Sequence, residues 1–174
     1  MLYVVILLFI VIASIRLLFL KISIKNEKNL VAEGAIQYGI KTTKLIVIIH
    51  ILAYFMFFSQ GIVNVLENKI HFDNIFYLGI IIYLFSLLSL IIVIKSLKHF
   101  WTVKIYISPK HIKIDNFLFK YIKHPNYYFN IIPEIISIAM IYRAWESLSI
   151  ILPIYIILLY IRIKQEEEAL SSIK

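Results

Sequence analysis

The sequence predicts an all-α integral membrane protein with about five transmembrane helices. Hydrophobic residues make up 61% of its 174 residues, and the mean hydropathy is +0.89, whereas soluble domains are close to half apolar. Charged residues amount to only 16%, and they lie between long apolar runs. Runs of this kind are typical of helices that cross the hydrocarbon core of a bilayer.

The apolar runs define the expected helices in order, within one domain over residues 1–174, because no repeat or linker divides the chain. The predicted spans are residues 1–20, 45–66, 74–94, 127–142 and 145–162. The fourth is slightly short for a bilayer, at about 1.5 Å of rise per residue. We therefore expect it to begin within the membrane interface.

The first connection is predicted as a polar stretch on the membrane surface, covering residues 21–44. Gly34 and Gly39 indicate a helix end and a turn within it. Arg16 interrupts the first span and is expected to extend to the nearer membrane surface. His50 in the second span is expected to make a structural hydrogen bond or to lie near the interface.

The orientation follows from the basic residues between the spans. Lys and Arg number six, one, seven, one and three in successive connections and at the C-terminal end. The positive-inside rule then predicts an external N-terminus and a cytoplasmic C-terminus. We interpret the net charge of +8 as this topology signal, so no nucleic acid partner is expected.

Composition also excludes several kinds of chemistry. The absence of cysteine rules out disulfides, thiolate metal sites and a thiol nucleophile. The histidines are scattered without an acidic cluster, so no metal site is predicted. No cleavable signal peptide is expected, because residues 1–20 lack a basic start and a small-residue cleavage site.

The last two spans carry the most informative pattern. Residues 123–127 (Lys-His-Pro-Asn-Tyr) precede one span, and residues 162–168 (Arg-Ile-Lys-Gln-Glu-Glu-Glu) follow the other. Only residues 143–146 join the two spans, which indicates a tight antiparallel hairpin. Folding the chain at this turn places Arg162 level with Tyr127, and Glu166 level with Lys123 and His124.

This arrangement resembles the isoprenylcysteine carboxyl methyltransferase family of membrane enzymes. The family pattern is Arg-His-Pro-x-Tyr followed, some thirty residues later, by Arg-x-x-x-Glu-Glu-x-x-Leu. Further signatures of a small bacterial subgroup extend the likeness over most of the chain: Asn26 to Leu30, Gly34, Tyr38, Gly39, Ser96, Leu97, Trp101 and Thr102. The chain departs from the pattern at Lys123, which replaces an arginine, and at Phe117 and Phe129, which replace glycines.

The resemblance implies S-adenosylmethionine as cofactor, bound at the cytoplasmic side by the C-terminal hairpin. The implied cofactor contacts are His124, Pro125, Asn126, Tyr127 and Glu166, with His111, Ile112, Lys113, Ile114 and Phe119 covering the cofactor. Arg162 is implied to position the acceptor substrate. An ordinary surface pair of Arg162 with Glu166, four residues later on one helical face, is the alternative.

Glu134 lies about two turns into the fourth span, where a carboxylate is costly enough to suggest a function. It is predicted to face the cofactor or the acceptor channel, and a structural hydrogen bond to a neighbouring helix is the alternative. Pro133 and Pro153 leave backbone carbonyls without their helical partners. Both helices of the hairpin are therefore expected to bend and widen a cavity.

The predicted function is methyl transfer from S-adenosylmethionine to the carboxylate or hydroxyl of a lipophilic acceptor with a prenyl or long alkyl chain. The predicted location is a bacterial cell membrane, with membrane lipid as the surroundings. Two alternatives stay open: a nicotinamide-dependent reductase of the related sterol reductase type, and a non-catalytic membrane scaffold. The oligomeric state and the identity of the acceptor are not predicted.

Overall fold

The computed structural model describes residues 1–108 and 123–171, and this part of the chain is almost entirely helical. In chain order the elements are α1 (Leu2–Ala32), β1 (Ile36–Tyr38), α2 (Ile40–Leu66), α3 (Asn74–Leu97), the 3-10 turn η1 (Lys98–Phe100), β2 (Ile105–Ile107), the π-helical turn η2 (Asn126–Ile131), α5 (Ile132–Tyr142) and α6 (Trp145–Ser171). The predicted all-α membrane class is confirmed.

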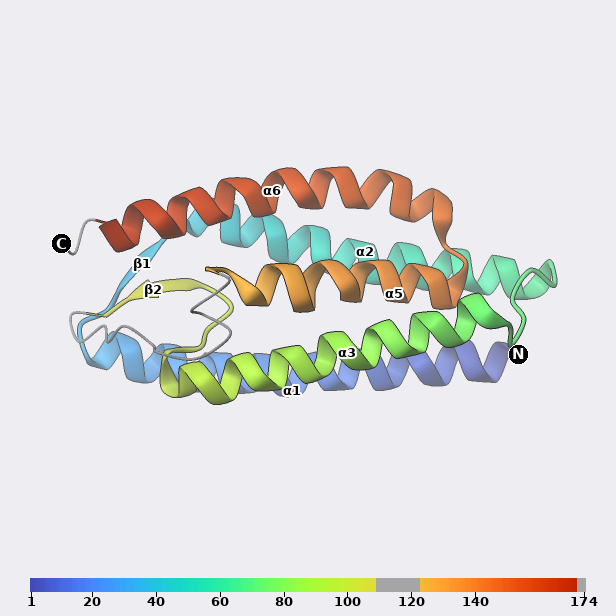
Figure 1. The fold of residues 1–174 in the computed structure, drawn as a ribbon, viewed down its shortest axis with the longest axis horizontal. Helices are drawn as coiled ribbons and strands as arrows, with labels where there is room; N and C mark the ends of the chain where they lie inside the picture. Colours follow the sequence, from blue (N-terminus) through green and yellow to red (C-terminus); the bar gives the residue numbers. More distant parts are fainter. Residues whose placement is uncertain (109–122, 172–174) are drawn as a thin grey trace.

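Among the described residues, four helices are long and apolar enough to cross a membrane: α1, α2, α3 together with η1, and α6. The fourth predicted span, residues 127–142, corresponds to η2 and α5, which follow one another without a break and are shorter. Figure 1 shows the helices running along one common axis, and α5 packs against α3, α2 and α6. The short segment is therefore enclosed by longer helices.

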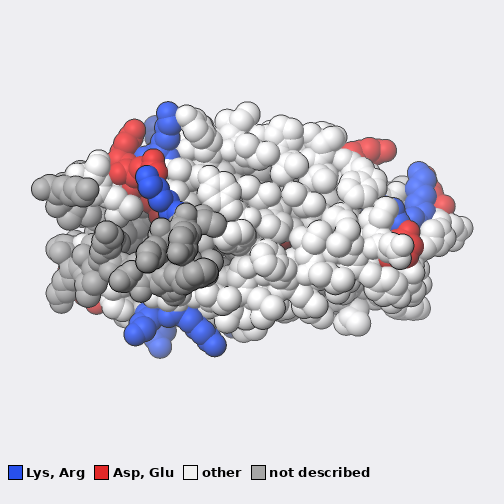
Figure 2. Space-filling model, viewed as in Figure 1, with Lys and Arg blue, Asp and Glu red and all other residues white. Residues whose placement is uncertain are grey.

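Charged side chains lie mainly at the two ends of the long axis. Figure 2 shows Lys, Arg, Asp and Glu gathered at both ends of the visible face, with a band of other residues between them. This band contains many exposed apolar side chains, among them Leu84, Phe85 and Leu88 on α3. An apolar band of this kind matches a hydrocarbon layer, which is where such side chains are most stable.

The first helix is longer than predicted. The predicted span ended at residue 20, with a surface connection from residue 21, whereas α1 continues to Ala32. Gly34 then ends the helix at φ 85°, and its N–H and that of Ala35 donate to the carbonyls of Val31 and Leu30. This is the glycine-terminated Schellman arrangement, so the predicted helix-end signal at Gly34 is confirmed.

A small antiparallel ladder lies at one end of the bundle. It pairs Ile36 with Ile107 and Tyr38 with Ile105, and the sequence analysis did not predict it. Ile105 and Ile107 are buried and pack against Ala169 near the end of α6. We call this end of the bundle, which carries β1, β2 and the end of α6, the ladder end (Figure 1).

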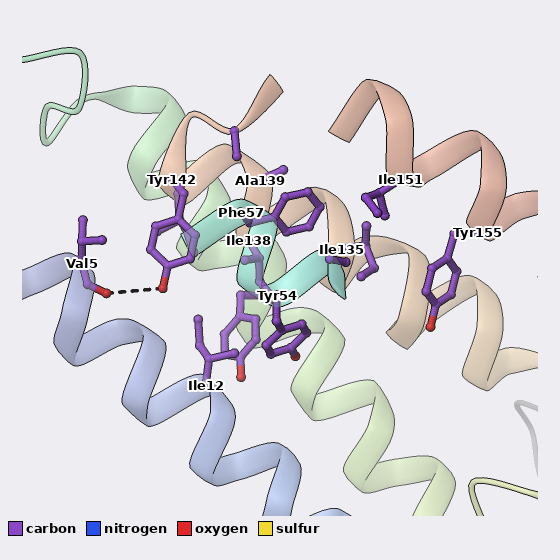
Figure 3. Close-up of a cluster of buried hydrophobic side chains, with 14 of the residues drawn as sticks. Val5, Ile12, Tyr54, Phe57, Ile135, Ile138, Ala139, Tyr142, Ile151 and Tyr155 are labelled. Atoms are coloured by element: carbon purple, nitrogen blue, oxygen red, sulfur yellow. Dashed lines mark hydrogen bonds between the residues drawn. The ribbon is translucent and has the colours of Figure 1, made fainter. Parts of the chain in front are cut away.

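The bundle core lies between α2, α3, α5 and α6, with α1 on one side. Figure 3 shows Phe57, Ile138 and Tyr142 within it, and the Tyr142 hydroxyl donates to the Val5 carbonyl at 3.4 Å. Gly79 allows α3 to approach α5, since a Cβ at that position would lie 3.1 Å from the Ser137 carbonyl oxygen. Small residues commonly allow such close contacts between membrane helices.

The turn between α5 and α6 is as tight as predicted. Arg143 adopts the left-handed conformation after α5, and the Ala144 N–H donates to the Ala139 carbonyl at 2.8 Å. Asn64 on α2 donates from its side-chain amide to the carbonyls of Tyr142 and Arg143. Arg143 also forms an ion pair with Asp73, the N-cap of α3. These contacts hold the hairpin against the two preceding helices.

Candidate functional site

The site begins where η2 opens the hairpin. Pro125 precedes η2 with φ −62°, a helical value that the proline ring favours, and its missing N–H costs nothing at a helix start. The π-helical turn ends just before Pro133, which cannot donate a backbone hydrogen bond to the Phe129 carbonyl. A π-turn shifts the hydrogen-bond ladder by one residue, and such turns are frequent at functional sites.

The hairpin register is as predicted. The Arg162 Nε donates to the Tyr127 hydroxyl at 2.9 Å, and the Tyr127 hydroxyl donates to Glu166 Oε2 at 2.8 Å. The His124 Nδ1 lies 3.3 Å from the same Glu166 oxygen. Lys123 Nζ lies 3.6 Å from Glu167 Oε1. Residues separated by nearly forty positions therefore form one polar cluster at the ladder end.

Arg162 is almost fully buried, with 5% of its surface exposed, and each of its three nitrogens donates to a protein acceptor. Besides the Tyr127 hydroxyl, Nη1 donates to the Thr43 hydroxyl at 2.8 Å and Nη2 to the Val103 carbonyl at 2.5 Å. These partners belong to α2, η2 and the segment before β2. Arg162 thus joins three parts of the chain as well as lying at the site.

The electrostatics of His124 follow from its two carboxylate neighbours. Burial lowers the pKa of His124, but the hydrogen bond and charge of Glu166, followed by those of Glu167, raise it by more. The net effect is a pKa above the usual histidine value of about 6.5. His124 therefore carries more positive charge at neutral pH than an isolated histidine would.

A cavity of about 570 Å³ extends from this cluster into the bundle. The predicted cofactor residues among the described ones all line it: His124, Pro125, Asn126, Tyr127 and Glu166, together with Arg162. The volume lies within the range of small-molecule sites. His111, Ile112, Lys113, Ile114 and Phe119 lie outside the described residues, as does Phe117.

Phe129, which replaces a family glycine, does not line this cavity. Its ring faces α3, where it packs edge-on against Phe85 with ring centroids 6.2 Å apart. The larger side chain therefore occupies a helix contact and leaves the cavity open.

The wall deeper in the bundle contains polar groups from three helices: Arg16 on α1, His50 and Tyr54 on α2, and Tyr155 on α6. The ring nitrogen His50 Nδ1 lies 2.8 Å from the Tyr155 hydroxyl. This contact confirms the structural hydrogen bond predicted for His50. Tyr54 and Tyr155 were not predicted as site residues, although Tyr54 lies one helical turn after His50.

The prediction that Arg16 extends to the membrane surface is wrong. It forms an ion pair with Glu134, and the Tyr54 hydroxyl donates to Glu134 Oε1 at 2.5 Å. A nearby carboxylate stabilises the guanidinium more than the distant interface does, because a buried charge needs a partner. Glu134 is buried and does not line the main cavity, which corresponds to the predicted alternative of a bond to a neighbouring helix.

Two residues at the site, Trp101 and Asn26, were named only as subgroup signatures, and the sequence assigned them no role. Trp101 is buried on the cavity wall, and within residues 1–108 and 123–171 its indole N–H has no hydrogen-bond partner. Its position depends on Asn26, whose side-chain amide donates to the Trp101 carbonyl at 2.8 Å. A buried donor without a partner is costly, so this N–H is available to a ligand.

Together the fold and the site define a polytopic helical membrane protein with a cavity that is polar at the ladder end and apolar toward the bilayer. The chain belongs to the isoprenylcysteine carboxyl methyltransferase family, whose family model matches residues 78–172. Membership points to a methyltransferase, and enzymes of this family generally use S-adenosylmethionine and act on lipophilic substrates.

Two bacterial relatives match most of the chain. An uncharacterized protein of Haemophilus influenzae is 43% identical over 162 residues, covering 93% of this chain and 92% of the relative. The uncharacterized protein YpbQ of Bacillus subtilis is 30% identical over 152 residues, covering 85% of each chain. No solved structure matches the chain.

Proposed function

We propose that the protein transfers a methyl group from S-adenosylmethionine to the oxygen of a lipophilic acceptor at the cytoplasmic side of a bacterial cell membrane. The observation that carries the proposal is the cluster of His124, Tyr127 and Glu166 around one end of a cavity that continues into the bundle. The basic residues of the connections support a cytoplasmic ladder end.

The residues present fit the cofactor. Glu166 offers a carboxylate to its ammonium or ribose hydroxyls, and the buried Trp101 N–H offers an unused donor. The cationic character of His124 suits its carboxylate. When bound, S-adenosylmethionine supplies a methyl group activated by a sulfonium.

The acceptor reaches the site from the lipid. Leu17 on α1 and Ile51 and Phe55 on α2 line the cavity, and each is at least half exposed on the outer surface of the bundle. The cavity wall is therefore continuous with the lipid-facing surface between α1 and α2. A prenyl or alkyl tail is stable there, because it exchanges one apolar environment for another.

Arg162 contributes as a positioning residue. Its three donors hold Tyr127, Thr43 and the Val103 carbonyl, so it shapes the wall that the acceptor meets and does not grip the acceptor itself. Glu134 acts indirectly. It binds Arg16 and Tyr54, and these two side chains line the cavity. The protein's contribution to the rate is alignment and exclusion of water, which account for much of the acceleration in such displacements.

The test is a titration of the purified full-length protein with S-adenosylmethionine and, separately, with NADPH. Saturable binding of the first, weakened in Glu166→Gln and unchanged in Glu168→Gln, supports the proposal. Binding of NADPH alone indicates the reductase alternative, and binding of neither indicates a scaffold. Lipids from cells with and without the gene, compared by mass, then identify acceptors that gain the mass of one CH₂ group.

A further inference from the structure

The contact between His50 and Tyr155 leaves one imidazole nitrogen unused on the cavity wall. His50 Nδ1 lies 2.8 Å from the Tyr155 hydroxyl, and Nε2 has no hydrogen-bond partner within residues 1–108 and 123–171. His50 itself lines the cavity. Nε2 is therefore available to a polar group on a ligand.

His50 also lies at a suitable depth for the acceptor. Tyr155 precedes Arg162 by seven residues on α6, and His50 follows Thr43 by seven residues on α2. Seven residues of helix span about 10 Å, so the His50 and Tyr155 contact lies some two turns deeper than the cluster proposed for the cofactor. The same cavity reaches both depths.

Three of the cations that line the cavity are paired with protein groups. Arg16 forms an ion pair with Glu134, and Lys104 with Glu27 at 2.6 Å. All three nitrogens of Arg162 donate to protein oxygens. A carboxylate entering the chamber has no proton to donate to Nε2, and it brings a charge into the bundle, which is costly. A neutral hydroxyl needs only one hydrogen bond.

We propose that His50 binds the hydroxyl of the acceptor and takes up its proton, so that the acceptor is a lipid carrying a phenol or an enol. This inference rests on the proposed function. The tautomer it requires has Nδ1–H donating to the Tyr155 hydroxyl, which leaves a lone pair on Nε2 to accept a hydrogen bond. Tyr155 is then a positioning residue that selects this tautomer.

The step balances without a further reagent. The acceptor O–H bond breaks and its proton goes to His50 Nε2, while a new O–C bond forms to the methyl carbon. The S–C bond breaks and its electron pair returns to sulfur, leaving a neutral thioether. The positive charge of the sulfonium thus reappears on the imidazolium, which releases its proton to water when the product leaves.

Two readouts on the full-length protein in detergent micelles test the inference. The first is calorimetric titration with a long-chain para-alkylphenol in the absence of cofactor. The second is product analysis with labelled S-adenosylmethionine and either the alkylphenol or N-acetyl-S-farnesylcysteine, which presents a carboxylate. Both are applied to the wild type, His50→Gln, Tyr155→Phe and the control His71→Gln, whose histidine is exposed and outside the cavity.

We expect a methyl ether from the alkylphenol with the wild type and with His71→Gln. His50→Gln should bind the alkylphenol about 10-fold more weakly and turn it over about 100-fold more slowly, the usual scale for a lost general base. Its affinity for S-adenosylmethionine should stay unchanged. Tyr155→Phe should lower the rate by less, because the base is still present.

Three results would overturn the inference: a methyl ester from the farnesylcysteine with no ether from the alkylphenol, wild-type turnover in His50→Gln, or no alkylphenol binding in protein that still binds S-adenosylmethionine. All three results leave methyl transfer itself standing. A wild type that binds no S-adenosylmethionine would instead remove the proposed function, while the alkylphenol titration still decides whether His50 binds a hydroxyl.

Discussion

The guanidinium of Arg162 and the hydroxyl of Tyr127, 35 residues apart, are joined by a hydrogen bond of 2.9 Å. The bond connects α6 to η2, at the point where the cavity meets the ladder end. The Tyr127 hydroxyl in turn donates a hydrogen bond to Glu166, which also contacts His124. A change at any of these side chains therefore affects both the hairpin and the site.

Arg162→Lys should destabilise the protein even though the charge is retained. A lysine ammonium cannot reach the Tyr127 and Thr43 hydroxyls and the Val103 carbonyl with the planar geometry of a guanidinium. We expect a loss of about 2–4 kcal/mol, measured as a lower thermal midpoint in detergent. Lys164→Ala on the exposed side of α6 serves as control, and equal midpoints for both variants would contradict a connecting role for Arg162.

Glu166→Gln should weaken binding of S-adenosylmethionine about 10-fold and lower the thermal midpoint less than Arg162→Lys does. The amide keeps a hydrogen-bond acceptor for Tyr127, but it loses the charge that pairs with His124 and with a cofactor cation. Calorimetric titration measures the affinity. The control Glu168→Gln changes an exposed carboxylate two residues after Glu166 and should bind S-adenosylmethionine like the wild type. The same loss of affinity in both variants would indicate a general effect of charge.

The contact between His124 and Glu166 should make stability depend on pH. The pKa of His124 in the folded protein lies above its unfolded value of about 6.5. Its contribution is therefore complete below that unfolded value and is lost as the pH rises through the folded pKa. Between about pH 6 and pH 9 the thermal midpoint of the wild type should fall more than that of His124→Gln. Parallel curves would show that the pKa of His124 is the same in the folded and unfolded protein.

The hairpin and its register could be predicted because they depend on local quantities. The position of the turn before Trp145 and the constant rise of a helix determine that Arg162 lies opposite Tyr127, and Pro125 marks the start. The polarity of each segment likewise determines whether it can cross the hydrocarbon core of a membrane. These features need no knowledge of which helices are neighbours.

The ion pair of Arg16 with Glu134 could not be predicted in the same way, because it joins residues 118 positions apart. Helical periodicity assigns each residue to a face, but it does not determine which other helix that face meets. The same applies to β1 and β2, which are too short to show a strand pattern and form by pairing with each other. The extension of α1 depends on such contacts too, since Glu27 pairs with Lys104 from beyond α3.

Arg16 and Glu134 should show strong energetic coupling. Arg16→Met leaves the Glu134 carboxylate with the Tyr54 hydroxyl alone, and Glu134→Gln leaves the guanidinium without its counter-charge. Each single variant should lose about 3–5 kcal/mol, as for other buried ion pairs broken on one side. The double variant removes both charges, so its loss should be smaller than the sum by at least about 1 kcal/mol. Denaturation of all four proteins in the same detergent measures the coupling, and strictly additive losses would show that the two charges do not stabilise one another.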